Sequence, residues 1–396
     1  MASDTPKPLA ARTENLVQSD IRAVTHLINR VGGINLGQGI CDLPTPEAIK
    51  AGAHAAIDED RSIYTSYAGI PELRQAIFQK ARTFNRIPAG DEDEVMVSIG
   101  STGAFVSAIF ALLDPGDEVI LFEPFYGYHR NLLRLPGASM RFVTMRGADW
   151  QIDFDEVERA ITPATKAVVI NTPGNPCGKV WTREELQNLL ALMQRYNLYA
   201  ITDEIYEYMT YDGCEHVSLA SLPGAYERTV TISGFSKTYN MTGWRLGYAV
   251  APPPLIEKMG LLNDLFSICA PAPLQHGVAR SFDLEDTYYA GMLADYAAKR
   301  RMMCDALETA GFTFSRPQGA YYVLASFEAL SRTRPGYAFG REACETLIQE
   351  AGVATVPGDS FYSDPERGRY LLRFCYAKEF PILEQACRQL VDAFTA

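Results

Sequence analysis

The sequence reads Ile232-Ser-Gly-Phe-Ser-Lys-Thr-Tyr-Asn-Met-Thr-Gly-Trp-Arg-Leu-Gly247 at the point that decides the fold. Before it, residues 229–233 alternate between polar and apolar side chains and are rich in β-branched ones, which is typical of a strand. After it, residues 246–251 form a second short apolar run. Lys237 is therefore predicted to lie in a turn rich in serine and glycine, between two buried strands.

This turn carries groups that suit a phosphorylated cofactor. Loss of water around Lys237 would lower the pKa of its amine and make the amine nucleophilic. The hydroxyls of Ser233 and Ser236 and the guanidinium of Arg245 suit a phosphate dianion. A nucleophilic lysine beside a phosphate site suggests a Schiff base with pyridoxal phosphate (PLP). The alternative is a lysine and an arginine solvated on a loop, and the stretch alone leaves both open.

Composition excludes several classes of protein. The 396 residues, of which 47% are hydrophobic, predict two to three domains with sizeable cores. The net charge is −12 and no lysine/arginine run exceeds three residues, which disfavours nucleic-acid binding. No apolar run approaches the roughly 20 residues that a membrane span requires.

The cysteines and the first residues predict a cytoplasmic protein. Eight cysteines are scattered without C-x-x-C pairs or histidine companions, so we expect neither a metal site nor a disulfide framework. The segment from Met1 to Pro6 lacks a basic stretch followed by an apolar core, so no signal peptide is expected.

From residue 94 onward, apolar strands alternate with helices. Strands are predicted at 94–98, 118–122, 167–171 and 198–202, which indicates a mostly parallel sheet with helices on both faces. Ligands of such sheets bind beyond the C-terminal ends of the strands. The polar residues that follow these strands include Tyr126, Asn175, Asp203 and Tyr206.

Gly100, Ser101 and Thr102 lie in a predicted turn at 99–103, which opens a helix over 104–113. The free N–H groups and positive dipole end of such a helix form a phosphate cradle. An ordinary helix cap is the alternative explanation for this turn.

The chain is predicted to form two domains. Residues 46–290 form the large domain with the sheet, and residues 1–45 together with 291–396 form a smaller α+β domain. The elements predicted for the C-terminal part are strands near 312–315, 320–326 and 369–375 and helices near 286–310, 338–351 and 381–394.

Eight segments, in order along the chain, spell a known family. They are Asn35-Leu-Gly-Gln-Gly39, Tyr64-x5-Ile-Pro-Glu-Leu-Arg74, Gly100-Ser-Thr-Gly-Ala104, Asn171-Thr-Pro-Gly-Asn-Pro-x-Gly178, Asp203-Glu-Ile-Tyr206, Ser233-Gly-Phe-Ser-Lys-Thr-x3-Thr-Gly-Trp-Arg245, Val356-Pro-Gly and Leu372-Arg-Phe374. With these, nearly the whole chain resembles the fold-type I PLP-dependent aminotransferases of class I/II. The family includes aspartate, kynurenine, glutamine–phenylpyruvate and methionine aminotransferases.

The resemblance implies a role for each residue around the cofactor. Lys237 would carry PLP and, once displaced by substrate, move the proton between the substrate and the cofactor. Asp203 would keep the pyridine nitrogen protonated, so that the ring accepts electrons. Asn175 and Tyr206 would hydrogen-bond the ring oxygen, and Tyr126 would stack on the ring. The catalytic residues implied are Lys237, Asp203 and Tyr206.

The resemblance also implies a phosphate site and a homodimer. The implied phosphate ligands are Gly100, Ser101, Thr102, Ser233, Ser236 and Arg245. Some relatives place the first serine three residues before the lysine, whereas Ser233 lies four residues before Lys237. In relatives, the tyrosine that matches Tyr64 reaches the phosphate of the neighbouring subunit, which implies shared active sites.

For the substrate, Arg373 matches the arginine that holds the α-carboxylate. Gly39 and Asn175 would lie beside that carboxylate, and Ile40 near the substrate side chain. Tyr362 stands where many relatives have glycine, which would narrow the entrance. No histidine is given a functional role.

The resemblance implies an aminotransferase that moves an amino group from an L-amino acid to a 2-oxo acid by a ping-pong mechanism. A PLP-dependent carbon–sulfur β-lyase is the alternative on the same fold. A regulator with an aminotransferase-like domain is disfavoured, because about thirty residues before Gly32 cannot hold a DNA-binding module. Ile40 and nearby tyrosines favour an aromatic or neutral donor, but aspartate stays open, as does the 2-oxo acid acceptor.

Overall fold

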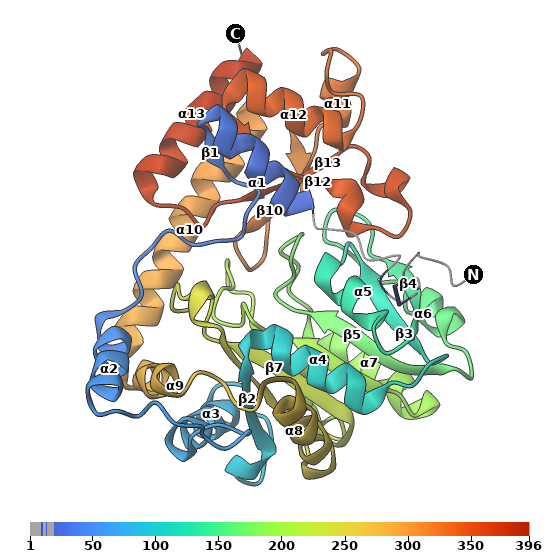
Figure 1. Cartoon of the computed structure of the whole chain (residues 1–396). Helices are drawn as coiled ribbons and strands as arrows, with labels where there is room; N and C mark the ends of the chain where they lie inside the picture. The colour runs from blue at the N-terminus through green and yellow to red at the C-terminus, as the bar shows by residue number, and fades with distance from the viewer. Residues whose placement is uncertain (1–8, 11–12, 14–19, 396) are drawn as a thin grey trace, which may run out of the picture.

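The computed structural model describes residues 9–10, 13 and 20–395, and these form an α/β structure (Figure 1). The largest sheet has seven strands in the order β2-β8-β7-β6-β5-β3-β4. β8 runs antiparallel to both neighbours and the other pairs are parallel, which confirms the mostly parallel sheet. The strands are β2 (Val95–Ile99), β8 (Leu246–Val250), β7 (Thr229–Gly234), β6 (Tyr199–Asp203), β5 (Thr165–Asn171), β3 (Glu118–Glu123) and β4 (Ser139–Thr144).

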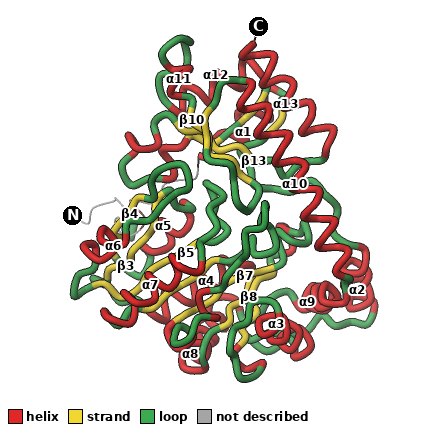
Figure 2. The backbone as a smooth tube through the Cα atoms, turned by 180° about the vertical axis from the view of Figure 1, so that it is seen from behind, coloured by secondary structure: helices red, strands yellow, loops and turns green. Residues whose placement is uncertain are grey.

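Helices cover both faces of this sheet, because its central strands are apolar on both sides (Figures 1 and 2). One face packs on α4 (Gly100–Leu112), α5 (Gly127–Leu133) and α8 (Pro253–Ser267). The other packs on α3 (Pro71–Thr83), α6 (Phe154–Ala160), α7 (Arg183–Tyr196) and α9 (Ala272–Ala279), and α2 (Glu47–Asp58) packs on α9. No described helix is long and apolar enough to cross a membrane.

A second, antiparallel sheet with the strand order β12-β13-β10-β9 lies above the first in Figure 1. Its strands are β9 (Thr313–Phe314), β10 (Tyr322–Ser326), β12 (Val356–Pro357) and β13 (Leu371–Cys375). The helices of this part are α1 (Asp20–Val31), α10 (Asp286–Thr309), α11 (Glu328–Ser331), α12 (Gly340–Ala351) and α13 (Phe380–Thr395). The N-terminal segment joins it, because β1 (Ile34–Asn35) pairs in parallel with β11 (Val353–Ala354).

The long helix α10 runs from the lower to the upper part of the molecule (Figure 1). The boundary predicted near residue 290 falls inside this continuous helix. The division into 46–290 and 1–45 with 291–396 therefore stays a prediction.

The structure corrects one predicted boundary. α4 begins at Gly100, although the sequence predicted a turn to residue 103 and a helix from Ala104. Gly100 has a φ of 67°, which lets the chain pass from β2 into the helix without an intervening loop. β4, α5 and α6 were not predicted.

Candidate active site

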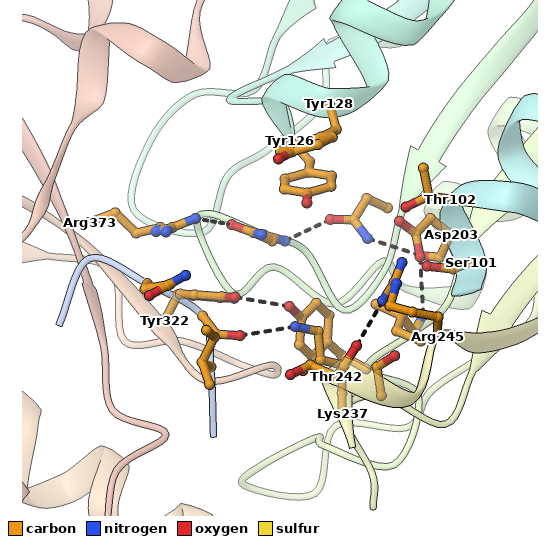
Figure 3. Close-up of a pocket in the computed structure, with 18 residues that line it drawn as sticks. Ser101, Thr102, Tyr126, Tyr128, Asp203, Lys237, Thr242, Arg245, Tyr322 and Arg373 are labelled. Carbon is orange, nitrogen blue, oxygen red and sulfur yellow. Dashed lines mark hydrogen bonds between the residues drawn. The ribbon is translucent and has the colours of Figure 1, made fainter. Parts of the chain in front are cut away.

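A cavity of about 320 Å³ opens where the loops of both sheets meet (Figure 3). Most residues that the sequence singled out line it: Gly39, Ile40, Ser101, Thr102, Tyr126, Asn175, Asp203, Tyr206, Ser236, Lys237, Arg245 and Arg373. Residues that line it and were not predicted are Gln38, Tyr128, Asn171, Ile205, Thr242 and Tyr322.

Lys237 lies in the turn after β7, as its flanking strands predict. Its Nζ donates to the carbonyl oxygen of Gly39 at 3.0 Å and lies 5.8 Å from the ring centre of Tyr206. Burial lowers the pKa of Lys237 to about 8. Its amine is thus neutral, and nucleophilic, over a wider pH range than that of an exposed lysine.

Asp203 ends β6 and is held by a histidine. Its Oδ2 lies 3.0 Å from Nε2 of His129, which is buried in α5 and stacks on Phe105 at 4.6 Å between ring centres. His129 was not predicted to have a role, because its contact with Asp203 joins residues 74 positions apart. The one available signal was its position three residues after Tyr126.

Arg373 brings a positive charge from β13 to the cavity and is only 1% exposed. It donates through Nη1 to Oδ1 of Asn175 at 2.8 Å and through Nη2 to the carbonyl oxygen of Gly37 at 2.5 Å. Its guanidinium lies 4.5 Å from the ring centre of Tyr322. No ion pair joins it to a carboxylate of the described residues, so it can attract a carboxylate that enters the cavity.

At the other end of the cavity, the N-terminus of α4 meets Arg245. Gly100 donates its N–H to the carbonyl oxygen of Arg245 at 3.0 Å, and a Cβ at Gly100 would lie 2.5 Å from Nη2 of Arg245. A Cβ at Gly247 would lie 2.3 Å from the nitrogen of Ser101. Glycines therefore allow the guanidinium and the N–H groups of the helix to approach closely. Such a donor set fits a phosphate dianion.

Three predicted site residues do not line this cavity. Tyr64 lies in the loop before α3 and is 77% exposed. Ser233 is buried, and its hydroxyl donates to Oε1 of Glu207 at 2.6 Å instead of facing the cavity. Gly100 contributes through the backbone contacts described above.

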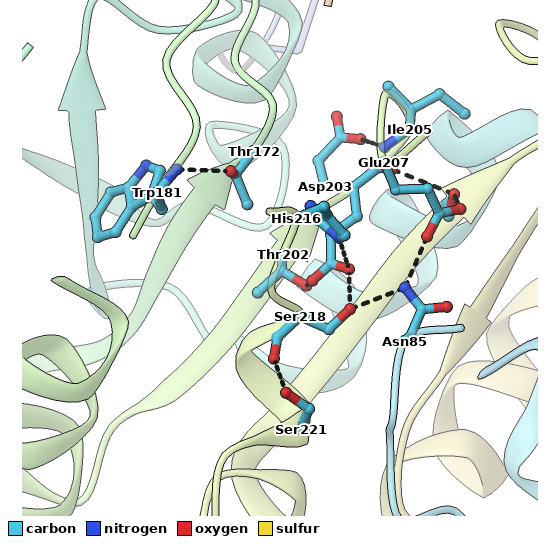
Figure 4. A network of polar contacts seen from close by, with 12 residues as sticks. Asn85, Thr172, Trp181, Thr202, Asp203, Ile205, Glu207, His216, Ser218 and Ser221 are labelled. Carbon is cyan, nitrogen blue, oxygen red and sulfur yellow. Dashed lines mark hydrogen bonds and ion pairs between the residues drawn. The ribbon is translucent and has the colours of Figure 1, made fainter. Parts of the chain in front are cut away.

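A network of buried polar groups lies beside the site (Figure 4). Glu204, Glu207 and His216 come close enough together to suggest a metal site. Their oxygens are already engaged, however, because Glu204 accepts from Thr202 and Ser218 and contacts His216. Glu207 accepts from Asn85, Ser233 and Tyr248, and it also contacts the ammonium of Lys80 at 2.5 Å. The lysine thus stands where a cation would bind, and we assign no metal.

The profile of the family described as aminotransferase class I and II matches residues 31–390. The chain belongs to this family. This aminotransferase is 33% identical over 382 residues to aromatic-amino-acid aminotransferase 2 of Thermococcus litoralis, with 96% of each chain covered. It is 32% identical to kynurenine–oxoglutarate transaminase 1 of Homo sapiens, over 89% of this chain and 90% of that protein.

The solved structure of N-succinyldiaminopimelate aminotransferase from Mycobacterium tuberculosis resembles this aminotransferase with a TM-score of 0.92 at 32% identity. That comparison covers 98% of this chain and 100% of the other. Fold type I and amino-acid aminotransferase activity, both expected from the sequence, are confirmed. The family is PLP-dependent.

Proposed function

We propose that this aminotransferase binds PLP in the cavity and transfers the amino group of a neutral or aromatic L-amino acid to a 2-oxo acid. One observation carries the proposal: Lys237, Asp203 and Arg373 line one cavity whose far end is formed by the N-terminus of α4 and Arg245. When bound, PLP would supply an electron-accepting ring for the bond broken at the substrate's α-carbon.

The phosphate end would be held by α4. Backbone N–H groups at Ser101 and Thr102, the hydroxyl of Ser236 and the guanidinium of Arg245 are donors that suit a dianion. The close approaches at Gly100 and Gly247 support this role. A larger residue at position 100 would meet the guanidinium of Arg245, and one at position 247 would meet the backbone nitrogen of Ser101.

Asp203 and Lys237 would perform the proton chemistry. The carboxylate of Asp203, oriented by His129, would hold a proton on the ring nitrogen. Nζ of Lys237 would take the proton from the α-carbon of the substrate and deliver it to the cofactor. Its lowered pKa supports this, because a base with a pKa near 8 can accept and release a proton near neutral pH.

The cations in the cavity favour a substrate with one carboxylate. Among the residues that line it, the cations are Lys237, Arg245 and Arg373, and each already has a role in the proposal. Arg373, oriented by Asn175, would hold the α-carboxylate bidentately. The ring of Tyr128 stacks on Tyr126 at 5.2 Å, which extends the apolar wall beside the substrate. An aspartate donor would need a further cation.

Two copies would form a homodimer with shared sites. Ile63 is 81% exposed beside Tyr64, and Leu265 on α8 is 80% exposed. The two regions are neighbours, because Asn263 of α8 donates to the carbonyl oxygen of Tyr67 at 2.8 Å. Exposed apolar side chains on these neighbouring segments favour an interface. The cytoplasmic location expected from the cysteines stays a prediction.

The test is the visible absorption spectrum of the purified enzyme with PLP, before and after addition of single amino acids. A yellow band that bleaches with aromatic or neutral donors and returns with 2-oxoglutarate is expected. Bleaching with aspartate alone would overturn the donor class. Release of pyruvate and ammonia from cysteine-type substrates would indicate the β-lyase reaction. Lys237→Ala is the matched control and should not give the yellow band of the lysine Schiff base. Absence of that band from the wild type would reject PLP.

A further inference from the structure

Tyr322, the first residue of β10, contacts two residues with different predicted roles. Its side chain is 2% exposed and lines the cavity (Figure 3). Its hydroxyl lies 3.0 Å from the hydroxyl of Tyr206, and the guanidinium of Arg373 lies 4.5 Å from its ring centre. Tyr322 therefore spans the distance between the expected carboxylate site and the expected cofactor site.

The position of this phenol is fixed by its packing. A Cβ at Gly39 would lie 1.9 Å from the hydroxyl oxygen of Tyr322, so only glycine fits against it. The ring of Tyr322 also packs on Tyr321 at 4.8 Å between centres. A hydroxyl held in this way loses little freedom when it makes a hydrogen bond.

Several groups face Tyr206. Tyr321, just before β10, and Tyr322, on β10, approach it at 5.1 Å and 5.9 Å between ring centres. Lys237 approaches it from the turn after β7 at 5.8 Å. Tyr126, before α5, and Arg373, on β13, line the same cavity. The hydroxyl of Tyr322 lies within hydrogen-bond distance of that of Tyr206, at 3.0 Å.

We propose that Tyr322 is a positioning residue whose hydroxyl donates to the hydroxyl of Tyr206 and strengthens Tyr206 as a donor to the cofactor. The proposal rests on the proposed function and on the role that the family resemblance implies for Tyr206, whose hydroxyl would donate its one hydrogen to the ring oxygen of PLP. Tyr206 then accepts from Tyr322, since each hydroxyl has one hydrogen. The cation of Arg373 beside the ring of Tyr322 favours this direction, because a positive charge makes a phenol a stronger donor.

Removal of the Tyr322 hydroxyl would weaken a chain of hydrogen bonds that ends on the cofactor. A less stabilised ring oxygen would hold its negative charge more poorly and favour protonation of the nearby nitrogen of Lys237. In PLP-loaded Tyr322→Phe, the pH midpoint of the visible absorption change should therefore rise. We expect a rise of about 0.3 pH unit, because only part of the effect of the lost hydrogen bond reaches the cofactor through Tyr206. Phenylalanine keeps the ring against Arg373.

Tyr376→Phe is the matched control. It also removes one buried phenol hydroxyl, which donates to the carbonyl oxygen of Ala320 at 3.0 Å, but Tyr376 does not line the cavity. We expect similar losses of melting temperature in both variants and a shifted spectral midpoint in Tyr322→Phe alone. Equal midpoints in wild type and Tyr322→Phe, or a shift in the control as well, would overturn the proposal.

A double-mutant cycle tests whether Tyr322 acts through Tyr206. In the Tyr206→Phe background, Tyr322→Phe should add no further shift. The same shift in both backgrounds would show that Tyr322 acts on the cofactor by another route and would overturn the inference. A wild type without a PLP band would instead overturn the proposed function, and this inference with it.

Discussion

Arg373 is a buried cation whose hydrogen bonds to Asn175 and Gly37 orient it without neutralising it. We expect Arg373→Ala to lower kcat/KM for amino acids by about 100-fold or more, because one partner of a buried charge pair is lost. Arg373→Lys keeps the charge but loses the fork that holds a carboxylate bidentately, so its loss should be smaller but clear. Steady-state kinetics test this, and a primary amine without a carboxylate is the control substrate. Equal losses for that amine would argue against a carboxylate role.

His129 should act through Asp203. His129→Phe keeps the stack on Phe105 but removes the contact of 3.0 Å with the carboxylate. A hydrogen bond to a charged group contributes about 1.5–3 kcal/mol, so PLP affinity should fall by roughly tenfold to a hundredfold. Equilibrium titration with PLP measures this, and unchanged affinity would remove His129 from the site.

The pKa of Lys237 predicts how stability depends on pH. Its pKa is about 8 in the folded enzyme and near 10.5 when unfolded, so the unfolded chain binds the proton more tightly. This costs the folded apoenzyme stability below pH 8, and the cost disappears as pH rises from 8 to 10.5. Apo Lys237→Met should therefore be more stable than the wild type at pH 7, by about 1–3 kcal/mol. Denaturant unfolding at pH 7 and 10 should show the difference shrinking; a constant difference would contradict it.

Single residues also show the limit of what the sequence can predict. The lysine turn and the arginine of β13 were found because motifs mark them. His129 and Tyr322 were missed, because their importance comes from contacts 74 and 116 residues away along the chain. Ser233 has the residue type that a phosphate needs, but its hydroxyl turns to a buried glutamate that spacing could not place.

At the level of elements, the buried strands were predictable because short apolar runs rich in β-branched residues are typical of buried strands. β4 is half exposed along much of its length at the edge of the sheet, so its pattern is weak. α5 and α6 have seven residues each, which is too short for a clear helical period. The start of α4 was misplaced because a glycine with positive φ replaced the expected loop.

That start of α4 gives a matched pair of glycines to test the phosphate cradle. Gly100→Ala forces an unfavourable φ and places a methyl 2.5 Å from Arg245, so PLP affinity should fall at least tenfold and stability by about 1–3 kcal/mol. At Gly103, in the same helix, a Cβ would meet its nearest atom at 3.4 Å, so Gly103→Ala should be neutral or slightly stabilising. Equal effects of the two variants on PLP affinity would argue against the cradle.

For the whole molecule, the proposed homodimer with shared sites makes a prediction that single variants cannot test. If each site takes Lys237 from one subunit and Tyr64 from its partner, a hybrid of Lys237→Ala and Tyr64→Ala subunits contains one site with both residues intact. Random mixing after reversible dissociation should then restore about a quarter of the wild-type activity. Mixing each variant with itself is the control, and Leu265→Lys, which charges the exposed end of α8, should weaken the dimer in sedimentation. Activity no greater than the sum of the two variants, with hybrids present, would mean that each site is built from one chain.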